Sequence, residues 1–243
     1  MKIFSKIFNS LFPEKIKCIV CGEELNNDNT NCICPVCLKT LPFINGNKCI
    51  RCSMPLSEGY DKVCFNCKAH NYSFTEVKSV FAYEGNIRNV IYKYKYEKAK
   101  YLGKYLSKFL VPVYAQTDWQ IDFVIAVPLH KNREKNRGYN QSKIMAETFC
   151  EITKLPELNI IKRIVDTPSQ TLLSHEERTK NLKDAFEIDK DKKNLIKDKN
   201  VLVIDDVYTT GATMQEITKL LQKNGAKNIY GLTLAHAVYK NTK

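Results

Sequence analysis

Residues 205–213 combine two adjacent carboxylates with a short loop rich in hydroxyl groups. Asp205 and Asp206 are followed by the loop Thr209–Thr213, which reads T-T-G-A-T. Carboxylates accept hydrogen bonds from vicinal hydroxyls and hold Mg²⁺ directly or through water. Loop N–H groups at a helix N-terminus form a phosphate site, to which threonine hydroxyls add donors. A phosphate, a diol and Mg²⁺ together describe a ribose 5-phosphate that carries a pyrophosphate.

A strand before this stretch and a helix after it are needed to position these groups. The apolar, partly β-branched run 201–204 predicts a buried strand, and the spacing of apolar residues over 212–224 predicts a helix that stops at Asn224-Gly225. Ligands of open α/β sheets bind at the carboxyl ends of the strands, where this loop lies. A strand with a merely polar cap explains neither the paired carboxylates nor the T-T-G-A-T loop.

Residues 201–213, VLVIDDVYTTGAT, resemble the phosphoribosyl pyrophosphate (PRPP) motif of type I phosphoribosyltransferases. The resemblance implies that Asp205 and Asp206 bind the ribose hydroxyls. It also implies that the loop of Thr209, Thr210, Gly211, Ala212 and Thr213 binds the 5-phosphate.

Cysteines dominate the first part of the chain, where nine of the ten fall within residues 18–67. Eight of them form C-x-x-C pairs, and two such pairs complete a tetrahedral zinc site. We expect structural Zn²⁺, one or two ions, at the following residues: Cys18, Cys21, Cys34, Cys37, Cys49, Cys52, Cys64 and Cys67. Cys150, amid apolar neighbours, is most simply a buried small hydrophobe.

The cysteine pattern leaves several arrangements open. Consecutive pairing into two ribbons competes with interleaved pairing, and Cys32 competes with Cys34 as a ligand, although the even spacing favours Cys34. Structural disulfides and a redox dithiol are the alternatives to zinc. A reducing compartment argues against disulfides, and four C-x-x-C pairs are too many for one redox centre. The N-terminal residues lack a secretory signal, and no run reaches membrane-spanning length, so we expect a cytoplasmic protein.

A basic stretch interleaved with tyrosines follows, between residues 88 and 108. It carries seven basic residues and one acid, which gives +6 of the net charge of +12 of the whole chain. Its apolar spacing predicts two amphipathic helices with the lysines outward, a face that attracts polyanions. The candidates for contact with nucleic acid are Arg88, Lys93, Lys95, Lys98, Lys100 and Lys104. A solvated face without a partner is the alternative.

Further strands and helices alternate along the rest of the chain. Residues 77–83, 121–128 and 228–237 read as strands, residues 139–153 as a helix, and residues 68–76 as a linker. This alternation predicts an α/β fold with a mostly parallel sheet. We therefore expect a cysteine-rich zinc-ribbon domain at 1–70 and a phosphoribosyltransferase-like domain at 71–243.

A basic loop leaves the strand 121–128 at the edge of the sheet where the ribose site is expected. With the ribose on the two aspartates, we expect the pyrophosphate to point toward this loop, and two later arginines to close over it. The candidates are Leu129, His130, Lys131, Arg137, Arg163 and Arg178.

The order of motifs resembles the ComF family of competence proteins. The matching motifs are the two zinc ribbons, R-G-Y-N-Q at 137–141, R-x₆-Q at 163–170, R-x-x-N at 178–181, A-F at 185–186, and the PRPP motif. Tyr139 stands where the family often carries Phe.

The resemblance implies a role in natural transformation, the uptake of single-stranded DNA. PRPP, single-stranded DNA, the competence helicase and other DNA-uptake proteins are the implied partners. An active phosphoribosyltransferase of nucleotide salvage, using PRPP and Mg²⁺, is the enzymatic alternative. A zinc-ribbon scaffold with a vestigial pocket is a third possibility. The acceptor, the oligomeric state and the occurrence of turnover stay open.

Overall fold

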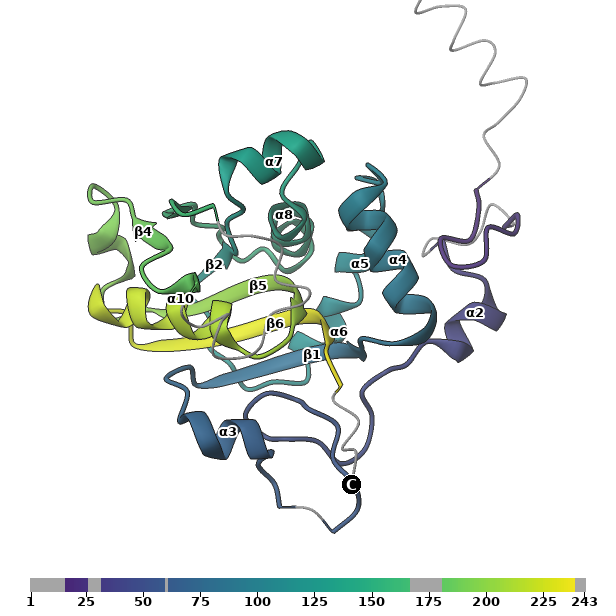
Figure 1. The fold of residues 1–243 in the computed structure, drawn as a ribbon, viewed down its shortest axis with the longest axis horizontal. Helices are drawn as coiled ribbons and strands as arrows, with labels where there is room; N and C mark the ends of the chain where they lie inside the picture. The colour runs from purple at the N-terminus through teal and green to yellow at the C-terminus, as the bar shows by residue number, and fades with distance from the viewer. Residues whose placement is uncertain (1–15, 26–31, 60, 167–180, 239–243) are drawn as a thin grey trace, which may run out of the picture. The chain divides into compact units, whose positions relative to one another are not determined.

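The computed structural model describes residues 16–25, 32–59, 61–166 and 181–238 (Figure 1). By their internal contacts the residues form two compact units, Met1–Leu41 and Pro42–Lys243. The second unit therefore contains the last four cysteines of the cysteine-rich region as well as the sheet. The division into domains at residue 70 stays a prediction.

A four-stranded parallel sheet forms the centre of the second unit. Its strand order is β1-β6-β5-β2 (Figure 1). The bounds are Glu76–Ala82 for β1, Phe123–Ala126 for β2, Asn200–Tyr208 for β5 and Asn228–His236 for β6. This sheet, with helices between its strands, confirms the predicted α/β fold. A separate antiparallel pair joins β3 (Ile161–Arg163) to β4 (Phe186–Ile188).

The central strand β5 is longer than its apolar run predicts. It continues through both aspartates to Tyr208, because β6 extends equally far and pairs Asp205 with Thr233 and Tyr208 with His236. The two carboxylates are therefore held by the ladder of the sheet itself, rather than by a loop beyond it.

Helices cover both faces of the sheet. The helices of the second unit are α3 (Phe65–His70), α4 (Gly85–Tyr96), α5 (Leu102–Ser107), α6 (Leu110–Tyr114), α7 (Lys131–Arg137), α8 (Gln141–Thr153), the 3₁₀ helix η2 (Lys193–Ile196) and α10 (Ala212–Lys223). In the first unit the structure describes α2 (Pro35–Thr40).

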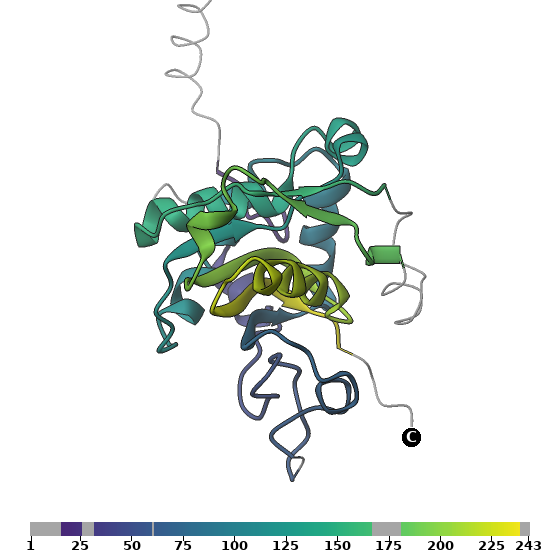
Figure 2. The ribbon, with the colours of Figure 1, turned by 90° about the vertical axis from the view of Figure 1, so that its left-hand side faces the viewer.

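The alternation of side chains along β5 separates the two layers of helices. Val201 and Val203 lie in one buried cluster with Ile217 and Leu221 of α10, which lies against the strands in Figure 2. Leu202 and Ile204 point to the opposite face, since successive side chains of a strand alternate. There α6 and α8 contact the strands and each other.

Two local predictions are wrong. Residues 68–76 are not a linker, because α3 reaches His70 and the side chains of Tyr72 and Phe74 are 6% and 1% exposed. The burial of these two aromatic side chains removes a large apolar surface from water, which a solvated linker would not do. The basic loop after β2 is the short helix α7, which His130 caps by accepting a hydrogen bond from the N–H of Asn132 at 3.3 Å.

Within the described part of the chain, no helix combines the length and the apolar character needed to cross a membrane.

Candidate functional site

The two aspartates of β5 form a largely buried acidic pair. One oxygen of Asp205 accepts hydrogen bonds from the Ser142 hydroxyl of α8 and from the N–H of Asp206, both at 2.9 Å. Asp206 is 3% exposed, and its Oδ2 has no hydrogen-bond partner among the described residues. Burial, and then the charge of Asp206, raises the pKa of Asp205 to about 7. The pair is thus placed to accept hydrogen bonds from a ligand's hydroxyl groups.

Lys95 of α4 supplies the positive charge beside this pair. Its Nζ lies 2.8 Å from Oδ1 of Asp206, and its side chain is 19% exposed. Burial lowers the pKa of Lys95, but the charges of Asp206 and Asp205 and the hydrogen bond to Asp206 raise it above its ordinary value. The expectation that the lysines of this stretch point outward is therefore wrong for Lys95, since the buried carboxylate draws it inward.

The loop after β5 ends on a helix start that suits an anion. Gly211 adopts φ +79°, and a Cβ there would collide with the Tyr208 hydroxyl, so glycine is required. The N-cap residue of the 12-residue helix α10, Gly211, offers no capping side chain, and the Thr210 hydroxyl accepts only a long hydrogen bond of 3.5 Å from the N–H of Ala212. The next N–H groups of the helix, together with Thr209 and Thr213, are therefore available to a phosphate.

Aromatic side chains hold the backbone of this loop in place. The Tyr72 hydroxyl donates a hydrogen bond of 2.6 Å to the carbonyl oxygen of Thr210. The Tyr208 ring packs between Phe74 and His236, with ring centroids 6.2 and 4.7 Å away. Burial lowers the pKa of His236 to about 4, so its ring is neutral at neutral pH. These contacts fix the backbone of the loop before any ligand arrives.

The R-G-Y-N-Q motif joins α4 and α8 beside the acidic pair. Arg137 stacks on Tyr96 at 5.4 Å, and Gly138 ends α7 with φ +86°. The Tyr139 hydroxyl donates to the Tyr94 carbonyl oxygen. Asn140 caps α8 and donates to the carbonyl oxygen of Val127 at 3.0 Å. The motif thereby places the first turn of α8, with Ser142, against the end of β5.

The pyrophosphate candidates after β2 lie at the expected edge of the sheet. The N–H of Val127 donates to the carbonyl oxygen of Ile204 at 3.0 Å, so Leu129 and His130 follow at the same end of the sheet as the acidic pair. Nδ1 of His130 lies 3.3 Å from Oδ2 of Asp166, and Lys131 is exposed at the start of α7. Arg137 instead lies over the ring of Tyr96 and donates a hydrogen bond to the side-chain oxygen of Gln141.

Of the two arginines expected to close the site, one is described. Arg163 ends β3, lies over the Phe186 ring at 5.7 Å, and interacts electrostatically with Asp205. Burial, then the charge of Arg133, lowers the pKa of Arg163. Arg178 and Gln170 lie outside the described residues.

The cysteines gather into two groups of four. The first quartet is Cys18, Cys21, Cys34 and Cys37, and the second quartet is Cys49, Cys52, Cys64 and Cys67; the sulfurs of each group lie within 4.8 Å of one another. Consecutive pairs thus come together, and Cys34 rather than Cys32 belongs to the first quartet. Cys150 is only partly buried on α8.

Both quartets fit a structural zinc ion. A tetrahedral ion with Zn–S distances of about 2.3 Å holds its sulfurs about 3.8 Å apart. The Cys21–Cys34 and Cys52–Cys64 sulfurs lie 3.9 and 3.6 Å apart. Backbone N–H groups of Cys34 and Cys64 donate to sulfurs of their quartets at 3.4 and 3.3 Å, which stabilises thiolates. The two Cys₄ sites are those of structural zinc in both number and type of ligand.

Basic and aromatic side chains remain exposed on α4 and on the residues that follow it as far as Lys104. This surface, called the α4 face, consists of Arg88, Tyr92, Lys93, Tyr96, Lys98, Lys100, Tyr101 and Lys104. The rings of Tyr92 and Tyr96 lie 5.0 Å apart on successive turns. This α4 face therefore has the cations and ring surfaces that single-stranded nucleic acids contact.

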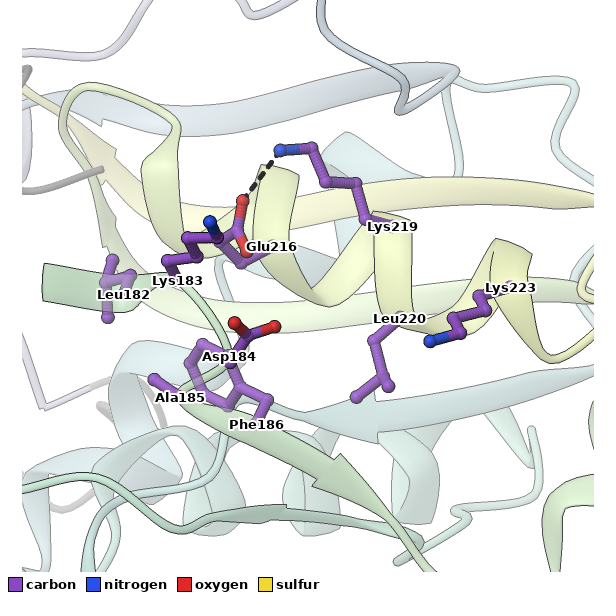
Figure 3. Close-up of a pocket in the computed structure, with 9 residues that line it drawn as sticks. All are labelled: Leu182, Lys183, Asp184, Ala185, Phe186, Glu216, Lys219, Leu220 and Lys223. Carbon is purple, nitrogen blue, oxygen red and sulfur yellow. Dashed lines mark hydrogen bonds and ion pairs between the residues drawn. The ribbon is translucent and has the colours of Figure 1, made fainter. Parts of the chain in front are cut away.

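A cavity of about 390 Å³ lies elsewhere, between α10 and residues 182–186 (Figure 3). Lys219 and Glu216 of α10 pair there at 2.8 Å, and Asp184 lies opposite them (Figure 3). The cavity contains no part of the acidic pair or of the loop 209–213.

Sequence reasoning missed Ser142 and Tyr72, and assigned Lys95 to another surface. Ser142 lies one residue beyond a recognised motif, which was a usable signal. Tyr72 meets Thr210 across 138 residues of sequence, and no local pattern announces such a contact.

Two family matches cover most of the chain. Residues 7–68 match the family described as Double zinc ribbon domain, and residues 135–243 match the family described as Phosphoribosyl transferase domain. Adenine phosphoribosyltransferase from Thermoanaerobacter pseudethanolicus is a similar solved structure, with 17% identity and a TM-score of 0.37 over 58% of this chain and 83% of that one. The sheet belongs to the phosphoribosyltransferase type by the family match.

Curated relatives align over nearly their whole length. Competence protein F of Haemophilus influenzae is 31% identical over 230 residues, 91% of this chain and 97% of that protein. Competence protein ComFC of Bacillus subtilis is 25% identical over 90% of this chain and 95% of that protein. DNA utilization protein YhgH of Escherichia coli (strain K12) is 27% identical over 80% of this chain and 86% of that protein. From this extended likeness, the chain belongs to the family of Competence protein F, the ComF family.

Proposed function

We propose that this protein acts in natural transformation in the cytoplasm, and that it binds PRPP with Mg²⁺ at the end of β5. The observation that carries the proposal is the buried acidic pair, followed by the start of α10 at Gly211, which offers no capping side chain. The names of the relatives, which speak of competence and of DNA utilization, support the biological role.

The ligand's three parts are assigned to three groups of residues. The ribose hydroxyls donate to Asp205 and Asp206, and the 5-phosphate accepts from the N–H groups at the start of α10. The pyrophosphate lies toward Leu129 and His130, with Arg163 beside it. Bound Mg²⁺ would neutralise pyrophosphate charge.

The α4 face is the proposed contact with single-stranded DNA. Its exposed cations suit a phosphate backbone, and Tyr92 and Tyr96 offer rings on which bases stack irrespective of sequence. The competence helicase and other DNA-processing proteins are the proposed partners within the pathway.

A genetic experiment tests the biological role. Deleting the gene in its source organism should lower the transformation frequency, and the wild-type gene should restore it. A gene carrying Asp205→Asn and Asp206→Asn should fail to restore it although the protein accumulates normally. Full restoration by this variant would show that the acidic pair has no part in transformation.

Turnover is tested separately on the purified protein. Phosphoribosyl transfer joins a nitrogen nucleophile to C1 of the ribose and releases pyrophosphate, with a proton leaving the nitrogen. Pyrophosphate release with nucleobases, ammonia or single-stranded DNA would establish the enzymatic alternative. If none of these acceptors releases pyrophosphate faster than PRPP alone does, the protein binds PRPP without transferring its ribosyl group.

A further inference from the structure

The first turn of α8 and the last turn of α4 hold the acidic pair from two sides. Ser142 of α8 donates to Asp205, and Lys95 of α4 pairs with Asp206. The Tyr94 hydroxyl donates to the Gln141 carbonyl oxygen at 2.8 Å, which ties the two helices together. Lys95 is therefore fixed by the same contacts that build the site.

Lys95 differs from the other lysines of the basic stretch. Lys93 and Lys98 are exposed, whereas Lys95 reaches a carboxylate that is 3% exposed. A long cationic side chain loses rotamer freedom and hydration when it is held in this way. An ion pair at this depth, next to a second carboxylate, lowers the electrostatic repulsion between two adjacent acids.

The arrangement leaves one acceptor atom free for a ligand. Lys95 occupies Oδ1 of Asp206, while Oδ2 is buried without a partner among the residues that the structure describes. A buried acceptor without a donor costs free energy, which a ligand hydroxyl can recover. The ion pair thus orients the carboxylate so that Oδ2 is left without a donor among the described residues.

We propose that Lys95 is a positioning residue of the PRPP site, which holds Asp206 in its binding orientation and favours the ionised form of the acidic pair. This inference rests on the proposed PRPP function. Under this inference Lys95 does not belong to the α4 face proposed to bind DNA. It acts instead on Asp206, which is proposed to bind the ribose hydroxyls.

The inference predicts a pH signature. The charge of Lys95 lowers the pKa of Asp205 against the raising effects of burial and of Asp206, so losing that charge shifts the ionisation of Asp205 to higher pH. The Tyr94 hydroxyl and the Arg163 guanidinium also interact electrostatically with the pair, and the Tyr83 hydroxyl interacts with Lys95 itself. All of these stay in place when only Lys95 is changed.

Calorimetric titration of PRPP with Mg²⁺ between pH 6 and 9 tests the inference with Lys95→Met. We expect an affinity loss of about tenfold or more at pH 7.5, and a rise of about one unit in the pH at which affinity reaches half its maximum. Lys95→Arg, which keeps the charge, should restore most of both. If Lys95→Met does not fold, Lys95→Gln serves in its place.

Lys199→Met is the matched control. Lys199 pairs with Asp122 at 3.1 Å near the other end of β5, so its loss removes a lysine–aspartate ion pair, more exposed than that of Lys95, away from the site. It should leave PRPP affinity and its pH profile unchanged.

The outcomes separate the inference from the function on which it rests. A wild-type protein that does not bind PRPP overturns the proposed function. Wild-type binding that Lys95→Met leaves unchanged overturns the inference alone. An affinity loss without a shift of the pH profile means a merely structural ion pair and also overturns it.

Discussion

The hydroxyl of Tyr72 donates a hydrogen bond of 2.6 Å to the carbonyl oxygen of Thr210. This bond links the segment that follows the second quartet to the loop proposed to hold the 5-phosphate. Tyr72, Tyr208 and Ala212 share one buried cluster with all four cysteines of the second quartet. The second quartet and the segment that follows it thus pack together with residues that hold the phosphate loop in place.

Replacing Tyr72 with Phe should weaken PRPP binding without unfolding the protein. The change removes one buried hydrogen bond, worth about 0.5–1.5 kcal/mol, which corresponds to roughly a 2- to 12-fold loss of affinity. Calorimetry measures the loss. Tyr230→Phe, at a ring that stacks on Trp119, is the control and should bind like the wild type. Equal affinity in both variants would mean that Tyr72 does not support the loop.

The two quartets should differ in their effect on PRPP. We expect two zinc ions per purified chain, and about one after either Cys64→Ser or Cys21→Ser, because three thiolates do not close a Cys₄ site. Only Cys64→Ser should lower PRPP affinity, since the second quartet shares a buried cluster with Tyr208 and Ala212 of the phosphate loop and its flank.

Elemental analysis counts the zinc, and thermal unfolding checks that each cysteine variant is folded at the temperature of the titration. Protein purified in reduced form without chelator and free of zinc would contradict the assignment. Equal PRPP binding by both variants would contradict the difference between the quartets.

Charge reversal on the α4 face should weaken binding of single-stranded DNA at every sequence. Replacing Lys93, Lys98 and Lys100 with Glu removes three cations that are exposed. Each neutralised phosphate contributes about 0.7 to the dependence of log affinity on log salt, so the slope should fall by about 2. Fluorescence anisotropy at several salt concentrations measures both quantities.

A matched variant changes the same charge elsewhere. Lys190, Lys192 and Lys193 are also exposed, and their replacement with Glu should have a smaller effect on the slope. If both triple variants lose affinity and slope equally, binding follows net charge and the α4 face is not the site.

Asparagine at position 205 should stabilise the ligand-free protein at alkaline pH. Burial, and then the charge of Asp206, raises the pKa of Asp205 to about 7 from its ordinary value near 3.8. A carboxyl whose pKa rises on folding contributes stability below pH 3.8 and loses it as the pH rises through 7. Asp205→Asn cannot ionise and so escapes this loss.

Denaturant unfolding at pH 5 and pH 8 measures this effect. The variant should gain stability relative to the wild type between the two pH values, by an amount of order 1 kcal/mol or more. A difference between the proteins that is the same at both pH values would contradict the raised pKa.

Much of the fold follows from local sequence patterns. The apolar runs at 201–204 and 228–237 predicted strands because residues buried on both faces of a parallel sheet must be apolar. The strand β5 nevertheless extends through two aspartates, which no propensity favours, because pairing with β6 supplies the hydrogen bonds.

The part of the site whose functional residues are neighbours in the sequence could be predicted. Asp205, Asp206 and the loop 209–213 lie together in sequence, so their residue types sufficed. Ser142, Tyr72 and the inward direction of Lys95 depend on contacts across long sequence separations. An amphipathic pattern indicates which side chains face the core, but it does not show that a buried carboxylate will attract one lysine of a basic face.

The most direct test of the PRPP site is a calorimetric titration of PRPP with Mg²⁺ into the wild type and the double variant Asp205→Asn, Asp206→Asn. Two charge-assisted hydrogen bonds of about 1.5–3 kcal/mol each give an expected affinity loss of roughly a hundredfold or more. Asp191→Asn with Asp198→Asn, two exposed acids, controls for the change of net charge.

Inorganic phosphate, which lacks the ribose, should bind the double variant as well as or better than the wild type, because negative charge has been removed. Tight PRPP binding by the wild type and the control, together with its loss in the double variant, is the result that the account predicts. Equal PRPP affinity in the wild type and the double variant would contradict the assignment of the ribose to Asp205 and Asp206.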